Sequence, residues 1–276
     1  MKATKALKKT LIASCCLVAF MIFLTLVLTP LVRMRQASVK PLNAETLAEL
    51  GIAAPDEADL PRVSSVSADA SGADTSKDAN TTESLSSSAK SRPSLRLARP
   101  ATAADARSRY RGYSGRWDRA FTGAWLGALK RVESAVWLVK PDSIGSFVLE
   151  IGTESFQMGD FTTARNYLRE ALRTEKRDFS REWICSRLSW LEEDPEVATA
   201  LLQESCASGN ALSLRDAMHL AIFTNSDDLA DYYFKRWSDA AGTEEVAQWF
   251  KFFSLYPKVQ EWKQRHAPNP PIEKGR

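Results

Sequence analysis

The chain of 276 residues is 44% hydrophobic and carries 37 basic against 34 acidic side chains, a formal net charge of +3 at pH 7. The basic excess lies in residues 1–35, which hold six basic residues and no acid, whereas residues 113–276 hold 21 basic and 24 acidic residues. This distribution excludes a basic domain of the kind that binds nucleic acid, and four cysteines are too few for a disulfide-rich extracellular fold.

The first predicted element is an uncharged run of 22 residues, Leu11 to Val32. A helix rises about 1.5 Å per residue, so the run is roughly 33 Å long, enough to cross a hydrocarbon core of about 30 Å. It predicts a transmembrane signal-anchor helix, residues 11–32, behind a short basic cytoplasmic tail, residues 1–10. Four lysines before the helix and three basic residues after it favour a cytoplasmic N-terminus and an extracytoplasmic C-terminal domain, in the periplasm or at the cell exterior.

Two other interpretations of this segment stay open. A cleaved signal peptide has an apolar region of only about 7 to 15 residues, and it ends at small residues. Residues Ile12 to Cys15 resemble the sequence before a lipid-modified cysteine, but the apolar stretch between Lys9 and Cys15 is too short for a signal peptide. The sequence therefore leaves open whether the anchor is cleaved or lipidated, and it identifies neither the host nor the membrane.

Residues 33–112 are predicted to be a disordered linker. The run from Val63 to Ser91 is mostly Ser, Ala, Asp and Thr, which bury too little apolar surface to offset their ordering entropy. One patch, Ala44 to Ile52, places three apolar residues close together. It indicates a short helix that forms on meeting a partner or, alternatively, a transient helix without a role.

The end of this linker is a basic arm, Lys90 to Arg111. It holds seven basic residues against Asp105 alone. Such an arm contacts an acidic surface, an anionic lipid or a polysaccharide, or it stays solvated without a specific partner.

Residues 113–265 are predicted to be an all-α domain, followed by a disordered tail, residues 266–276. Apolar residues recur at helical spacing from Trp117 to Leu138, and no stretch of period two is long enough for a strand. Capping residues then begin a series of helices. The predicted ranges are 144–158, 161–175, 181–192, 195–207, 213–224, 227–239 and a last helix from 243.

Three segments of this domain align as internal repeats that share an alanine and, one helical turn later, a large apolar residue. The alanines lie 34 and then 32 residues apart. The aligned pairs are Ala164 with Leu168, Ala198 with Leu202, and Ala230 with Phe234. Each unit is therefore predicted to be a helix, a tight polar turn and a second helix whose alanine lets the first pack closely.

The best-matching unit, residues 145–178, resembles the tetratricopeptide repeat family. The match rests on Ile151-Gly152, Gly159-Asp160-Phe161, Ala164, Leu168 and Ala171-Leu172. The later units depart from the pattern, since Ser186 and Met218 replace Gly152, and Ser205 and Trp237 replace Ala171. The resemblance covers about 100 residues and implies a helical-hairpin repeat array, a TPR-like α-solenoid.

In such an array the first helices of successive units line a concave surface that binds a protein or peptide partner. Carried over residue by residue, the resemblance gives the candidate partner-binding residues Phe156, Trp183, Arg187, Trp190, Arg215, His219 and Phe223. Aromatic residues with arginine suit a binding surface. The alternative is that Trp183, Trp190 and Phe223 are core residues and that His219 is a packed or capping histidine.

No catalytic, cofactor or metal site is predicted. Two histidines and two domain cysteines supply no cluster of metal ligands, and no phosphate-binding loop or nucleophile motif is present. A disulfide between Cys185 and Cys206 is disfavoured because the two residues lie about four residues out of step around the turn near 193, but the sequence does not exclude it.

These features predict a single-pass membrane protein that is not an enzyme and that displays an interaction scaffold or adaptor on the extracytoplasmic side. The alternative is an envelope-associated hydrolase whose all-helical site leaves no local motif. A third interpretation is an anchored regulator that signals through the nine residues before the span. Neither the partner nor the oligomeric state can be inferred from the sequence.

Overall fold

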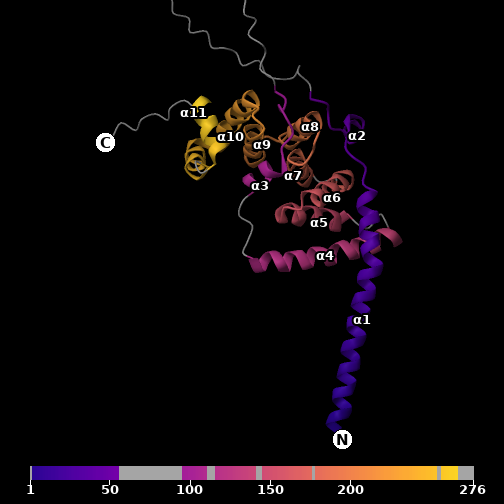
Figure 1. The fold of residues 1–276 in the computed structure, drawn as a ribbon. Coiled ribbons are helices and arrows are strands. Elements are labelled where there is room, and N and C mark those ends of the chain that lie inside the picture. The colour runs from indigo at the N-terminus through magenta and orange to yellow at the C-terminus, as the bar shows by residue number, and fades with distance from the viewer. Residues whose placement is uncertain are drawn as a thin grey trace, which may run out of the picture.

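The computed structural model describes residues 2–55, 95–110, 116–140, 145–175, 178–253 and 256–266. Within these ranges every regular element is a helix, so the prediction of an all-α fold is confirmed. The helices, in chain order (Figure 1), are α1 Lys2–Ala37, α2 Ala44–Glu49, α3 Ala103–Arg109, α4 Arg116–Val139, α5 Gly145–Met158, α6 Phe161–Thr174, α7 Asp178–Ser189, α8 Pro195–Ser205, α9 Ala211–Phe223, α10 Asp227–Phe253 and α11 Pro257–His266.

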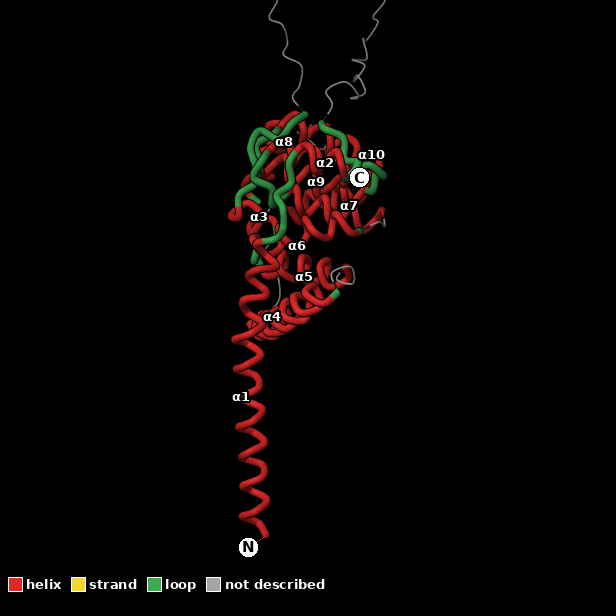
Figure 2. The backbone as a smooth tube through the Cα atoms, turned by 90° about the vertical axis from the view of Figure 1, so that its right-hand side faces the viewer, coloured by secondary structure: helices red, strands yellow, loops and turns green. Residues whose placement is uncertain are grey.

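Most of helix α1 projects away from the other helices (Figure 2). Its part Ser14–Ala37 is long and apolar enough to cross a membrane, and none of its most apolar window is buried against the protein. The tertiary contacts of α1 with described elements are mainly with α4 and α6. Near the end of α1, Arg35 is buried and donates a hydrogen bond of 2.9 Å to the carboxylate of Glu133 in α4.

The helices after α4 pack in consecutive pairs, α5 with α6, α7 with α8, and α9 with α10. Local sequence sets the turns between them. Asp160 caps α6 by accepting from the backbone N–H of Thr163, and Asp194 caps α8, with Pro195 at its favoured first position. Gly159 has a positive φ of 78°, a conformation that glycine adopts at little cost. These predicted helix starts are therefore confirmed.

Small residues let the paired helices approach closely. The three aligned alanines are fully buried, at 0% exposure: Ala164, Ala198 and Ala230. In the first pair, a Cβ added to Gly152 of α5 would lie 2.9 Å from the side chain of Leu168 in α6, closer than real Cβ contacts allow. Glycine at this position thus sets the distance between α5 and α6.

Several predicted boundaries in the domain differ from the structure, among them the ends of α7 at Ser189 and of α8 at Ser205. Helix α9 begins two residues early because the side chain of Asn210, and not Ser213, caps it. Helix α7 begins at Asp178, ahead of the predicted cap Ser180. The predicted helices 227–239 and 243 onward are joined in α10, whose only break is the non-helical backbone of Gly242. Helix α11, within the predicted domain, was not foreseen.

The linker boundaries also differ, because two parts of residues 33–112 pack on the helical domain. Residues 38–55 bury Leu42, Leu47 and Ile52, and the carbonyls of Lys40 and Leu50 accept hydrogen bonds from Arg173 and Arg181. The patch Ala44 to Ile52 thus contains the helix α2, which packs against its own chain, whereas both interpretations of the sequence left it unpacked. Residues 95–110 pack as well. The predicted disorder of residues 56–94 and of the tail 267–276 lies outside the described residues.

Candidate functional site

The side of α5, α7 and α9 that faces residues 95–110 is called here the inner face. Three of its aromatic residues come from the predicted set and meet in a row of ring contacts: the rings of Trp190 and Phe223 have centroids 5.7 Å apart, and Phe156 joins them through Tyr110. Phe156, Trp190 and Phe223 are each at most 3% exposed. They are core residues in this structure, as the alternative interpretation held for Trp190 and Phe223.

Tyr110, at the end of α3, covers part of the inner face. Its ring centroid lies 4.9 Å from that of Phe156 and 5.6 Å from that of Trp190, edge to face in both cases. Burial, and then the charge of Asp216, raise the pKa of the Tyr110 hydroxyl, so it stays protonated. The residues 95–110, which are the described part of the basic arm, therefore lie where the repeat resemblance expects a partner.

Arg187 joins this arm to the inner face. Its guanidinium donates hydrogen bonds to the hydroxyl of Tyr110 and, at 2.9 Å, to the carboxylate of Asp216. It also lies 4.8 Å from the centroid of the Tyr110 ring and 5.3 Å from that of Trp183. Arg109 of α3 binds the other oxygen of Asp216 at 3.0 Å. Asp216 thus forms ion pairs with two arginines, Arg109 of α3 and Arg187 of α7.

A cavity of about 360 Å³ opens beside these arginines, between α7 and α9. Arg215, 27% exposed, lies in its wall and makes a long ion pair of 3.6 Å with Glu245. Trp183 supplies a half-buried aromatic wall, and Leu212 is exposed at the opening. The full lining is Arg109, Tyr110, Glu182, Trp183, Ser186, Arg187, Asn210, Leu212, Ser213, Arg215 and Asp216.

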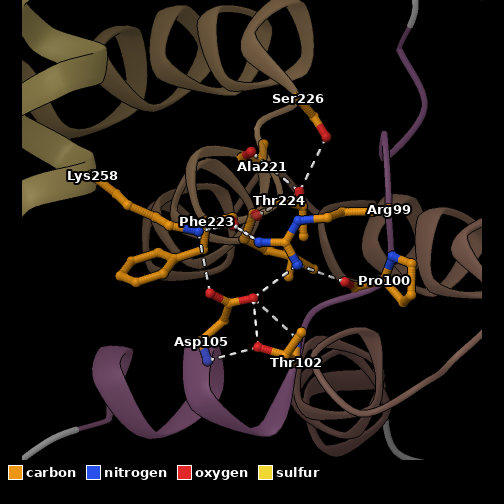
Figure 3. Close-up of polar contacts among 10 residues, drawn as sticks. Arg99, Pro100, Thr102, Asp105, Ala221, Phe223, Thr224, Ser226 and Lys258 are labelled. Carbon is orange, nitrogen blue, oxygen red and sulfur yellow. Dashed lines mark hydrogen bonds and ion pairs between the residues drawn. The ribbon is translucent and has the colours of Figure 1, made fainter.

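The beginning of the arm closes the end of α9 (Figure 3). Arg99 and Lys258 both donate to the carbonyl oxygen of Phe223, at 2.6 and 2.7 Å, and so neutralise the negative end of the helix dipole. Asp105 joins the two cations, at 2.8 Å from Arg99 and 3.2 Å from Lys258. Burial alone would raise the pKa of Asp105, but its hydrogen bonds to Arg99, Thr102 and Lys258 outweigh that and lower the pKa to about 2.

Backbone groups of the arm are bonded as well. The N–H of Leu97 donates to the hydroxyl of Thr199 at 3.1 Å, and the N–H of Ala98 to the hydroxyl of Ser226 at 2.8 Å. Leu97 is buried. The arm is therefore held on the helical domain by specific contacts of its described residues, so that part of it is not a solvated segment.

His219, also in the predicted set, is fully buried in α9. Its Nε2 accepts a hydrogen bond of 2.9 Å from the indole N–H of Trp249, and the two rings stack. Burial, and then the charges of Arg109 and Arg215, lower the pKa of His219 well below its ordinary value. Its role here is that of a packed histidine, the alternative named above.

Of the seven predicted residues, the structure thus places Trp183, Arg187 and Arg215 together at the cavity and the other four in the core. Sequence reasoning missed Arg109, Tyr110 and Asp216, which complete the cavity. The only available signal was the arm's density of arginines, which suggested an acidic contact but not that Asp216 of the same chain would supply it.

The described residues contain no cluster of His, Cys, Asp and Glu that could hold a metal ion. Cys185 and Cys206 are buried and free, so the disulfide left open by the sequence is absent, and burial raises the pKa of both thiols to about 12. Comparison with protein-family models, curated proteins and solved structures finds no match to this chain.

Proposed function

We propose that the protein is a single-pass membrane-anchored scaffold. Its TPR-like array binds an acidic peptide segment of a partner protein at the cavity between α7 and α9. Helix α1 provides the anchor, and the lysines before it favour an array on the extracytoplasmic side. The observation that carries the proposal is the cavity itself, in which three arginines and a tryptophan converge: Arg109, Arg187, Arg215 and Trp183.

The chemistry of the cavity suits a carboxylate beside an apolar side chain. A guanidinium has five N–H donors in a fixed fork, and Arg187 uses its Nη1 for Asp216 and for the hydroxyl of Tyr110. Among the described residues, the ion-pair partner of Arg215 is the half-exposed Glu245, at a long 3.6 Å. Trp183 offers an aromatic wall, and tryptophan and arginine dominate the binding energy of many protein interfaces.

The arm supports the same conclusion from another direction. Residues 95–110 are a peptide segment that inserts Tyr110 between Phe156 and Trp190 and bonds to Arg187 and Asp216 through side chains. The inner face therefore already binds one short segment of polypeptide. A partner segment enters the remaining cavity beside it.

The hydrolase considered above requires carboxylates that converge with raised pKa values. The two acids of the cavity are Glu182 and Asp216, and Asp216 is ion-paired with two arginines. This arrangement favours binding of a negative group over acid catalysis.

The test uses the full chain in lipid nanodiscs and fluorescent peptides of one length that carry Glu, Gln or Lys at a single position next to an aromatic residue. We expect the Glu peptide to bind most tightly. The variant Arg215→Glu should weaken it about tenfold, because a hydrogen bond to a charged group contributes roughly 1.5 to 3 kcal/mol.

The matched control is Lys235→Glu, the same charge reversal at an exposed position of α10 outside the cavity. It should leave the affinity unchanged. Equal binding of the Glu and Lys peptides, or equal weakening by the two variants, would show that the cavity does not select an acidic segment and would overturn the proposal.

A further inference from the structure

Helix α4 carries an apolar stripe whose large side chains the described residues leave between 47% and 84% exposed. Its members recur at helical spacing and are Phe121, Trp125, Ala128, Val132 and Val139. At about 100° per residue they fall within roughly 60° of one another around the helix. Phe121 is 75% exposed and Val139 84% exposed. An apolar row of this length on a surface marks an interaction site.

The other apolar side of the same helix is covered. Leu126 and Leu129 are buried, at 5% and 6% exposure, and α4 packs on α5 and on the end of α1. Leu129 lies only about 40° around the helix from Trp125, so the stripe adjoins the face that the fold uses and extends it outward.

Helix α4 lies next to the end of the predicted membrane span, which bears on what covers the stripe. In Figure 1 α4 runs across α1, at the boundary of the helical domain on the side from which α1 projects. One of the contacts between them is made by Arg35, which bonds to Glu133 at 2.9 Å and lies 5.5 Å from the centroid of the Trp137 ring. Arg35 follows the last residue of the uncharged run, Val32, by three residues, or roughly 4.5 Å along the helix.

This position along α1 matches the depth at which interfacial helices lie in a membrane. If α1 spans the bilayer, its uncharged run ends at the boundary of the hydrocarbon core, and α4 lies at the level of the headgroups. Amphipathic helices that lie in the membrane plane bury their apolar face roughly 5 to 10 Å into this region. Tryptophan, present in the stripe as Trp125, is enriched there because its ring is apolar with one polar N–H.

The charges near the stripe suit a lipid surface as well. From Phe121 to Val139 the only acid is Glu133, which is fully buried and bound by Arg35. Arg131 is half-buried on the same helix, and Lys140 and Arg33 are exposed at its end and at the end of the span. Anionic headgroups therefore meet cations and no exposed carboxylate along this part of α4.

We propose that α4 is an interfacial membrane helix, with its stripe inserted among the lipid headgroups and upper acyl chains of the leaflet that borders the domain. The inference rests on the proposed anchoring of the protein by α1. The partner is the lipid bilayer, and the effect is to hold the helical array against the membrane surface.

The experiment uses the full chain in liposomes with a single environment-sensitive fluorophore on an introduced cysteine. The positions are Ala128→Cys in the stripe, Ala240→Cys on α10 as the matched exposed alanine, and Leu26→Cys in α1 as a report on the anchor. Cys15 and Cys16 are replaced by serine. Cys185 and Cys206 are buried with pKa values raised to about 12, so they stay unlabelled.

We expect the label at position 128 to emit at shorter wavelength and to be quenched by lipids that carry a shallow nitroxide, as lipid contact requires. The label at position 240 should emit as in water and be quenched only by a water-soluble reagent. The label at position 26 should be quenched by a deep nitroxide.

Each other result has a distinct meaning. A label at 26 in lipid with a label at 128 in water overturns the interfacial helix and leaves the anchor intact. A label at 26 in water overturns the anchor and the inference with it. A label at 128 that is blue-shifted without lipid quenching, and that crosslinks to 128 of a second copy, replaces the lipid by a dimer contact and also overturns the inference.

Discussion

Helices α4 and α9 are both rich in apolar residues, but only α9 is covered around most of its circumference. Eight residues of α9 are buried, including an unbroken run from Ala217 to Phe223. Helix α9 packs on α7, α10 and α11, whereas α4 packs on α5 and on the end of α1. An apolar helix in the middle of the stack becomes core, and one at its end keeps a free apolar face, so apolar content alone does not identify the core.

The sharpest test of this difference makes the same change in both helices. Phe223→Ala in α9 should lower the free energy of unfolding by about 3 to 5 kcal/mol, because it removes a side chain that is 3% exposed and leaves a cavity. Phe121→Ala in α4 should change it by no more than about 0.5 kcal/mol, because that ring is 75% exposed. Denaturant unfolding of the full chain in mild detergent measures both. Equal losses would mean that the stripe of α4 is packed against protein after all.

A second pair of variants adds a methyl group instead of removing a ring. Gly152→Ala places a Cβ 2.9 Å from Leu168 and 3.2 Å from its backbone nitrogen, so α5 and α6 must separate, at a cost of about 1 to 3 kcal/mol. Gly123→Ala, in the open part of α4, meets only the end of Met158 at 3.8 Å. That variant should stabilise the helix by roughly 0.5 to 1 kcal/mol, because alanine loses less backbone entropy than glycine. Thermal unfolding midpoints that move in the same direction for both would contradict the close approach at Gly152.

The smallest effect concerns pH and the buried histidine of α9. The pKa of His219 is lowered in the folded chain, by burial and then by two arginines, whereas in the unfolded chain it has its ordinary value near 6.5. Below that value the unfolded state takes up a proton that the folded state does not. The free energy of unfolding should therefore carry no penalty from His219 above pH 6.5. It should fall by about 1.4 kcal/mol per pH unit as the pH drops below that value.

Unfolding titrations between pH 7.5 and 5.5 measure this slope. The variant His219→Gln keeps an acceptor for the indole N–H of Trp249 and cannot titrate, so it should flatten the curve over this range. A slope that persists in the variant would assign the pH dependence to other groups.

The parts of the fold that could be predicted from the sequence depend on neighbouring residues. Asp160 and Asp194 cap the helices that follow them, because a cap needs only the next two or three backbone N–H groups. At the start of α9 the same reasoning selected Ser213 although Asn210 was available three residues earlier, since both side chains can cap. Local signals find a helix more reliably than its first residue.

The placement of the arm could not be predicted, because its contacts join residues far apart in the sequence. Leu97 bonds to Thr199, 102 residues away, and Arg109 to Asp216, 107 residues away. Composition predicted a linker because the neighbouring run, residues 63–91, is mostly Ser, Ala, Asp and Thr. The apolar contacts of the arm come from a few residues, Leu95, Leu97, Ala101, Ala106 and Tyr110. For the candidate site, the repeat resemblance pointed to residues of α7 and α9, some of which line the cavity, but it could not reveal that the same chain covers part of their inner face.

The buried pair Arg35 and Glu133 has a mechanical consequence. Tyr167 of α6 donates to Glu133 at 3.1 Å, and Glu170 of α6 lies 3.5 Å from Arg35, so four side chains from three helices fasten the end of α1 to the first hairpin. A force applied along α1 therefore passes directly into α4 and α6 and does not first extend a slack chain. The helical domain is therefore fastened to the end of α1 by direct contacts, and its own size sets how far it reaches from that helix.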